Sequence, residues 1–275
     1  MANQEIKIVF VAPTFGSALQ ISLVRNFRKF CKPEELALRS ATDDADKQME
    51  CLKQALSQNK ATALIAMDIQ PDSNTISAFS AANVPIVLFD EEAVGVSTIA
   101  IDNYKGGFIA GEYLISKGKK KIAIVSGRTK VKGGYNSELR LKGFQQALKA
   151  KGLLIPEGCT IEVLHYSRKD GIEVMPMLLA KDVDAIFCAA GDNCAQGLLT
   201  VANERIVRIP NDVAIVGFDD LPIARLLTPT LTTVKQPLEE MAKAAYNMVV
   251  NQRSEILRNP KKVIFNPELV IRKSA

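Results

Sequence analysis

Two neighbouring stretches, Val213-Ala-Ile-Val-Gly-Phe-Asp-Asp220 and Leu231-Thr-Thr-Val-Lys-Gln-Pro237, decide the predicted fold. The first is an apolar run that ends in two carboxylates, and the second ends in an amide and a proline. Runs that are apolar on both faces are typical of strands in a parallel sheet that helices cover on each side. Ligands of such sheets bind outside the carboxyl ends of the strands, so Asp219 and Gln236 are candidate ligand contacts. The alternative is that Asp-Asp after a strand forms only a turn or a helix cap.

Short apolar strands alternate with helices along the whole chain. The pattern predicts strands over 6–11, 36–40, 63–67, 86–89, 98–101, 121–125, 160–164, 185–189, 213–218, 231–235, 263–266 and 269–272. It predicts helices over 19–30, 44–59, 74–82, 103–116, 138–150, 170–179, 194–203 and 238–257. Two such series indicate an α/β fold of two doubly wound parallel-sheet lobes, and the cleft between lobes is then the expected ligand site.

Composition narrows the class of protein. The chain has 275 residues, which suits two lobes, and its 47% hydrophobic and 24% charged residues are ordinary for a globular protein. It lacks the run of roughly 18 apolar residues that a membrane span needs and lacks a secretory signal pattern, which predicts a cytoplasmic protein without membrane contact. The five scattered cysteines include no C-x-x-C pair, which predicts reduced thiols. The net charge of +5 permits contact with a polyanion but does not argue for it.

The common signatures of enzymes and cofactor sites are missing. The sequence contains no G-x-G-x-x-G after the first strand, no phosphate-binding G-x-x-x-x-G-K-[ST] loop and no G-x-S-x-G nucleophile elbow. A single histidine, His165, excludes a site with two histidine ligands and argues against a Ser-His-Asp triad. We therefore expect no catalytic residue, no metal and no cofactor. An enzyme on a doubly wound fold stays a minor alternative.

Polar residues at predicted strand ends are the remaining candidates for chemistry. Carboxylates accept hydroxyl hydrogen bonds, arginine donates a fork of them, and an aromatic ring can stack on the apolar face of a sugar. The sequence offers no nucleophile, base and oxyanion donor together, so we expect binding of a sugar-like molecule and not catalysis. The candidate ligand-binding residues are Phe15, Asp90, Arg140, Asp192, Asp219 and Gln236.

These motifs together give the chain a family resemblance. It resembles the effector-binding core of the LacI/GalR transcriptional regulators, and through them the periplasmic sugar-binding proteins. The most specific part runs from Ile209-Pro-Asn-Asp-Val-Ala-Ile-Val-Gly-Phe-Asp-Asp-Leu-Pro222 to the end of Leu227-Thr-Pro-Thr-Leu-Thr-Thr-Val-Lys-Gln-Pro237. Supporting parts are Asp43–Gln48, Asp102–Gly107, Arg140–Phe144 and Ala190–Gly197.

The resemblance implies an architecture and a site. It implies a periplasmic-binding-protein-like fold, with residues 1–102 plus 237–258 in one lobe, 103–236 plus 259–275 in the other, and three crossings between them. The effector would lie between the lobes, where Asp90, Arg140, Asp219 and Gln236 match ligand-contacting positions and Phe15 looks like the aromatic contact. Closure around the effector would be a rigid-body motion.

Two departures from the family pattern matter. The family usually has Asn-Asp where this chain has Gly191-Asp192, which puts the usual sugar contact in doubt. Such regulators also carry a helix-turn-helix head of about 50–60 residues, and we expect that this head is absent here because only five residues precede Ile6.

We therefore expect the ligand-sensing and dimerising core of a LacI-type regulator. It would bind a carbohydrate or a similar polar metabolite, form a homodimer and reach DNA only through its head. The alternative is the solute-binding protein of a sugar transporter, which would share the fold and the cleft.

Overall fold

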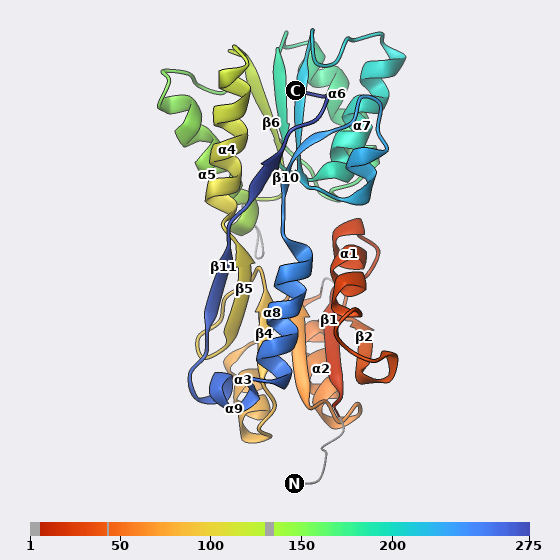
Figure 1. Ribbon diagram of the computed structural model, residues 1–275, viewed down its shortest axis with the longest axis vertical. Coiled ribbons are helices and arrows are strands. Elements are labelled where there is room, and N and C mark those ends of the chain that lie inside the picture. The colour runs from red at the N-terminus through yellow and green to blue at the C-terminus, as the bar shows by residue number, and fades with distance from the viewer. Residues whose placement is uncertain (1–5, 43, 130–134) are drawn as a thin grey trace. The chain divides into compact units, whose positions relative to one another are not determined.

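The computed structural model describes residues 6–42, 44–129 and 135–275, and it divides into two α/β units. One unit comprises Met1–Ile101 and Pro237–Phe265, and the other comprises Asp102–Gln236 and Asn266–Ala275. The chain therefore passes from one unit to the other three times, as expected. Each unit contains a six-stranded sheet with helices packed on it, so the prediction of two doubly wound lobes is confirmed (Figure 1).

The sheet of the first unit has the strand order β11-β5-β4-β3-β1-β2 and is parallel throughout. Its strands are β1 (Ile8–Ala12), β2 (Leu36–Ser40), β3 (Ala63–Met67), β4 (Ile86–Phe89), β5 (Ser97–Ile101) and β11 (Lys262–Phe265). Its helices are α1 (Ala18–Phe27), η1 (Pro33–Glu35), α2 (Ala45–Ser57), α3 (Ser73–Ala81), α8 (Leu238–Val250) and α9 (Arg253–Arg258).

The sheet of the second unit repeats this order as β12-β10-β9-β8-β6-β7. Its strands are β6 (Ile122–Ser126), β7 (Thr160–Glu162), β8 (Ala185–Cys188), β9 (Ala214–Asp219), β10 (Thr232–Lys235) and β12 (Glu268–Val270). Its helices are α4 (Asn103–Ser116), α5 (Tyr135–Lys149), α6 (Arg168–Leu179), α7 (Asp192–Glu204) and the short η2 (Pro222–Arg225).

The strands are apolar on both faces because each sheet lies between two layers of helices. Successive side chains of a strand point to opposite faces, so Phe10 packs in a core cluster with residues of α1 and α8, while Val9 packs in another with residues of α2 and α3. In the second unit, Ile186 likewise packs with residues of α6 and α7, and Phe187 with residues of α4 and α5. This burial explains the continuous apolar runs in the sequence.

Three details differ from the sequence-based expectation. The helix predicted over 238–257 is two helices, because the backbone N–H groups of Asn251 and Gln252 both donate to the carbonyl of Asn247 and the regular ladder stops there. Residues 259–265 were expected in the second lobe, but β11 pairs with β5 and so extends the sheet of the first unit. Finally, β12 runs antiparallel to β10.

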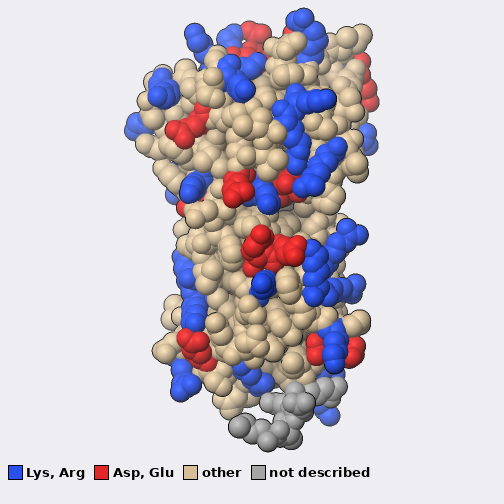
Figure 2. All heavy atoms as spheres, viewed as in Figure 1, with Lys and Arg blue, Asp and Glu red and all other residues tan. Residues whose placement is uncertain are grey.

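The surface carries charges of both signs. On the face shown in Figure 2, basic and acidic side chains are interspersed over each unit, in keeping with 35 basic and 30 acidic residues in the sequence. Across the described residues, no helix has the length and apolar character that a membrane span requires.

Candidate functional site

Buried polar side chains gather at the carboxyl ends of the strands in the second unit. Asp219 is the last residue of β9, Gln236 directly follows β10, and Arg140 comes from α5. They are 7%, 3% and 9% exposed, respectively. Because polar groups are costly to bury without partners, such a cluster either stabilises the fold through internal bonds or binds a ligand. The hydrogen-bond partners of each side chain distinguish a structural role from a ligand-binding role.

Asp219 and Gln236 are hydrogen-bonded to each other. The strands β9 and β10 are parallel neighbours, and their register pairs Lys235 with Asp219. Nε2 of Gln236 donates to Oδ1 of Asp219 over 2.6 Å. Burial raises the pKa of Asp219 to about 6, although the Arg140 charge and the Gln236 hydrogen bond both act to lower it. Within the described part of the chain, Oδ2 of Asp219 receives no hydrogen bond, so this oxygen is the acceptor that a ligand can use.

Contacts with Asn103, Ala189 and Phe218 hold Arg140 in place. Its Nε donates to Oδ1 of Asn103 over 2.7 Å, and its Nη1 donates to the carbonyl of Ala189 over 2.9 Å. Its guanidinium carbon lies 3.7 Å from the centre of the Phe218 ring, which is a cation–π distance. These contacts fix the guanidinium plane at the ends of β8 and β9.

Two glycines allow α4 and α5 to approach closely enough for this arrangement. A Cβ atom on Gly107 would overlap the carbonyl oxygen of Arg140, and one on Gly143 would overlap the carbonyl oxygen of Tyr104. The backbones therefore cross in direct contact. As a result Asn103, the first residue of α4, reaches the Arg140 side chain.

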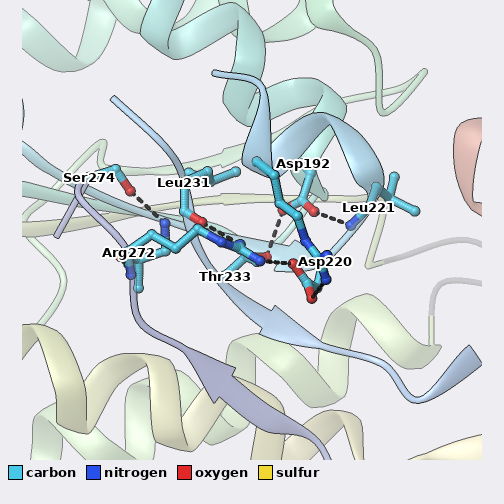
Figure 3. A network of polar contacts seen from close by, with 9 residues as sticks. Asp192, Asp220, Leu221, Leu231, Thr233, Arg272 and Ser274 are labelled. Carbon is cyan, nitrogen blue, oxygen red and sulfur yellow. Dashed lines mark hydrogen bonds and ion pairs between the residues drawn. The ribbon is translucent and has the colours of Figure 1, made fainter. Parts of the chain in front are cut away.

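Asp192 has an internal role, in contrast to the predicted ligand contact. It is 0% exposed, Oδ2 accepts from the backbone N–H of Leu221 over 2.7 Å, and Oδ1 accepts from the Thr233 hydroxyl over 2.6 Å. Burial, reinforced by the neighbouring charge of Asp219, raises its pKa well above the usual range. Asp192 thus connects the start of α7 to the loop after β9 and to β10 (Figure 3).

Asp220 also bonds within the protein, although the motif places it beside Asp219. Its side chain forms ion pairs with Nη2 of Arg272 over 2.5 Å and with Nη2 of Arg225 over 3.6 Å. Arg272 also donates to the carbonyl of Leu231, so the last residues of the chain hold the loop that follows β9 (Figure 3). Of the two adjacent carboxylates, Asp219 alone keeps an oxygen without a partner among the described residues.

Phe15 and Asp90 belong to the first unit. Phe15 follows β1, is partly buried, and packs edge-on against Phe10 with ring centres 5.8 Å apart. Asp90 follows β4 with φ of 55°, and its Oδ1 accepts from the backbone N–H of Ile101 over 3.3 Å. Both residues therefore lie at carboxyl ends of strands, which is where ligand contacts of α/β sheets occur. Their contact with a ligand stays a prediction.

Sequence reasoning missed several residues that shape the cluster in the second unit. Asn103 and Phe218 position Arg140. Both lie within motifs that carried the family resemblance, but neither was predicted as a site residue. Ser126, the last residue of β6, has a buried hydroxyl without a hydrogen-bond partner among the described residues. No local pattern distinguishes these residues, because their roles depend on the packing of α4, α5 and three strands.

The architecture places a cluster of buried polar side chains at the carboxyl ends of parallel strands, and comparison with known proteins identifies the family. Residues 112–275 match the model of the periplasmic binding protein-like domain. The HTH-type transcriptional repressor PurR of Klebsiella pneumoniae strain 342 is 30% identical over 284 residues, which cover 99% of this chain and 80% of the repressor. The chain belongs to the periplasmic-binding-protein-like family, as the effector-binding core of a LacI-type regulator.

Solved structures agree with this assignment. A periplasmic binding protein/LacI transcriptional regulator from Alkaliphilus metalliredigens QYMF, complexed with D-xylulofuranose, is 26% identical, with a TM-score of 0.81 over 98% of this chain and 99% of that regulator. A LacI family regulator from Enterococcus faecium with bound ribose is 21% identical and has a TM-score of 0.84, again over 98% of both chains. The second likeness shows the shared fold.

Proposed function

We propose that this chain senses a small polar effector, a carbohydrate or a similar metabolite, at the carboxyl ends of β8, β9 and β10. The observation that carries the proposal is the Asp219 carboxylate, which is buried, is held at one oxygen by Gln236 and keeps its other oxygen available as an acceptor. The guanidinium of Arg140 is rigidly placed at the same strand ends. A carboxylate and a guanidinium together match the donors and acceptors of a hydroxyl-rich molecule.

The relatives support a regulator that binds a sugar-like effector. The Alkaliphilus regulator holds D-xylulofuranose and the Enterococcus regulator holds ribose. The similarity to a transcriptional repressor favours regulation over the alternative of a transporter's solute-binding protein. We propose a binding role without catalysis, in the cytoplasm and as a homodimer.

In the proposed mechanism the effector shifts a conformational equilibrium. A ligand can change DNA binding only if it binds one conformation of the regulator more tightly than the other. We propose that Phe15 and Asp90 of the first unit also contact the effector, so that binding engages both units. In this proposal a helix-turn-helix head would bind the DNA.

A thermal-shift screen with D-ribose, D-xylulose and cellobiose tests the proposal, because a ligand that binds the native state stabilises it by mass action. Asp219→Ala is expected to abolish the shift of any probe that stabilises the wild type. The matched control is Asp212→Ala, which removes an exposed carboxylate of the same unit that pairs with Arg208. A shift that persists undiminished in Asp219→Ala would show that the site is elsewhere.

Phe15→Ala and Asp90→Ala test the contribution of the first unit. Each should weaken binding of the probe about tenfold or more, as the loss of one stacking or hydrogen-bonding contact does. Unchanged affinity in both variants would restrict the site to the second unit.

A further inference from the structure

Gly191 occupies a position that no other residue type can share with the present Asp219 side chain. It lies between β8 and α7 with φ of 100°, a backbone conformation that L-amino acids rarely adopt. A Cβ atom built on it would lie 2.8 Å from Oδ2 of Asp219, below any normal contact between a carbon and an oxygen. The carboxylate of Asp219 therefore lies where a side chain of residue 191 would begin.

We propose that Gly191 determines the specificity of the effector site, because it makes room for the Asp219 carboxylate over the start of α7 and so selects effectors that present hydrogen-bond donors there. This inference rests on the proposed function, since it concerns the ligand of the same site. The selected ligands carry hydroxyl or N–H groups at the point that faces Oδ2 of Asp219.

A hydrogen bond from Gln236 holds the carboxylate in this place. Gln236 fixes Oδ1 through a hydrogen bond of 2.6 Å, which directs Oδ2 toward Gly191. Asp192 does not take over the role of acceptor, because it is fully buried and its two oxygens accept from Leu221 and Thr233 inside the protein. The effector therefore meets the carboxylate of Asp219 at this point of the site.

A side chain at residue 191 would change the chemistry of the site. An asparagine there, which the LacI/GalR resemblance leads one to expect, would displace Oδ2 of Asp219, whose carboxyl group also carries the oxygen that Gln236 binds. It would also bring an amide that donates as well as accepts. The site would then offer a different set of partners to the same ligand.

The charges around Asp219 also depend on this arrangement. Arg140 from α5 attracts the carboxylate, whereas Asp192 from α7 repels it. Asp220 on the same loop is paired with Arg272 and Arg225. A displaced Asp219 would leave this set of neighbours, so its titration reports on its position without any ligand.

A double-mutant cycle of Gly191→Asn and Asp219→Asn tests the inference by titration calorimetry with D-ribose, D-xylulose, cellobiose and adenine. In the wild-type background, Asp219→Asn should weaken the best-binding probe at least tenfold, in line with a lost hydrogen bond to a charged group. In the Gly191→Asn background the same change should alter affinity less than threefold, because the carboxylate has already left its place. Equal effects in both backgrounds would overturn the inference while leaving the proposed function intact.

A wrong assignment of the effector site would give a different result. If no probe binds the wild type in a manner that depends on Asp219, then the effector site itself is wrong. The Gly191–Asp219 relationship can still be decided without a ligand, by urea unfolding. Gly191→Asn should cost less stability in an Asp219→Ala background than in the wild type, because the clash is gone, and an identical cost in both backgrounds would overturn the inference.

Gly152→Asn is the matched control for the backbone. Gly152 lies in the same unit with φ of 69° and has no atom within 4 Å of the position of a Cβ. The loss of stability in Gly152→Asn should reflect only the strained backbone, and it should be the same with and without the Asp219 carboxylate. If Gly191→Asn does not fold, then Gly191→Ala, which carries the same Cβ, takes its place in both cycles.

Discussion

Nε2 of Gln236 lies 2.6 Å from Oδ1 of Asp219, so the residue that follows β10 holds the residue that ends β9. The two residues are 17 positions apart in the sequence, and the parallel register of β9 and β10 brings them together. The hydrogen bond stabilises the ionised form of a carboxyl group that burial would otherwise keep protonated. Four predictions follow from this pair and from its neighbours.

Replacing Gln236 by Leu should raise the pKa of Asp219 above its present value of about 6. The substitution removes a hydrogen bond that lowers this pKa, while burial, which raises it, remains. The measurement is an NMR titration of the Asp219 carboxyl carbon in both proteins. Gln252→Leu, at an amide of the first unit, is the control. An unchanged or lower pKa in Gln236→Leu would contradict the assigned cause.

Asp219→Asn should change how stability depends on pH. The folded pKa of about 6 lies above the ordinary aspartate pKa of 3.8, so the folded state binds the proton more tightly. Asp219 therefore destabilises the fold increasingly as pH rises from about 4 to about 6. The free energy of unfolding of Asp219→Asn, relative to that of the wild type, should therefore rise by up to about 3 kcal/mol as pH increases from about 4 to about 6. Urea unfolding of both proteins from pH 3.5 to pH 7.5 measures this difference.

Asp212→Asn serves as the control of opposite sign. The hydrogen bond from Arg208 lowers the pKa of Asp212 to about 2, so its stabilising contribution is complete above about pH 4 and is lost as pH falls toward 2. Its difference from wild type should stay constant between pH 5 and pH 7.5. A profile of Asp219→Asn that is equally flat there would rule out the raised pKa.

Arg140→Lys should destabilise the protein almost as much as Arg140→Ala. A lysine cannot reproduce the two hydrogen bonds, to Asn103 and to the Ala189 carbonyl, together with the flat contact on Phe218. We expect losses of about 2–4 kcal/mol, typical of a broken buried network. Urea unfolding measures them, with the exposed Lys142 replaced by Ala as the control. A loss below about 1 kcal/mol would mean that these contacts add little to stability.

Asp192→Asn should be tolerated far better than Asp192→Ala. The raised pKa of Asp192 favours the protonated acid, which an amide of the same shape imitates toward Leu221 and Thr233. Alanine leaves both groups without a partner and should cost about 2–3 kcal/mol more than asparagine. Thermal unfolding of the two variants at pH 7 distinguishes them. Equal costs would indicate that Asp192 is ionised and that its charge is needed.

The internal role of Asp192 illustrates what a strand-end pattern cannot resolve. Asp192 and Asp219 both come at or just after the carboxyl end of a buried strand. From this position alone, the sequence predicts that both contact a ligand. In the structure, Asp192 begins α7 and turns inward to Thr233, whereas Asp219 keeps Oδ2 without a hydrogen bond from any described residue. The difference depends on a strand and a loop that lie far away in the sequence.

The sequence by itself determined the class of fold and the edge of the sheet where the polar side chains gather. Apolar runs on both faces of a strand require two covering layers of helices, and this is a local property that each segment carries. Local sequence did not predict the helix break near Asn251 or the pairing of β11 with β5. Backbone hydrogen bonding determines the first, and the choice of a neighbouring strand determines the second.

Only the tertiary structure decided which polar side chain is available to a ligand. That choice requires knowing which hydrogen bonds the fold itself uses, and those bonds join residues from different strands and helices. The Gln236–Asp219 pair, the Asn103–Arg140 pair and the placement of the Asp219 carboxylate where a side chain of residue 191 would begin all arise this way. The physical reason is that burial and distance are properties of packed elements, which no single segment of the chain contains.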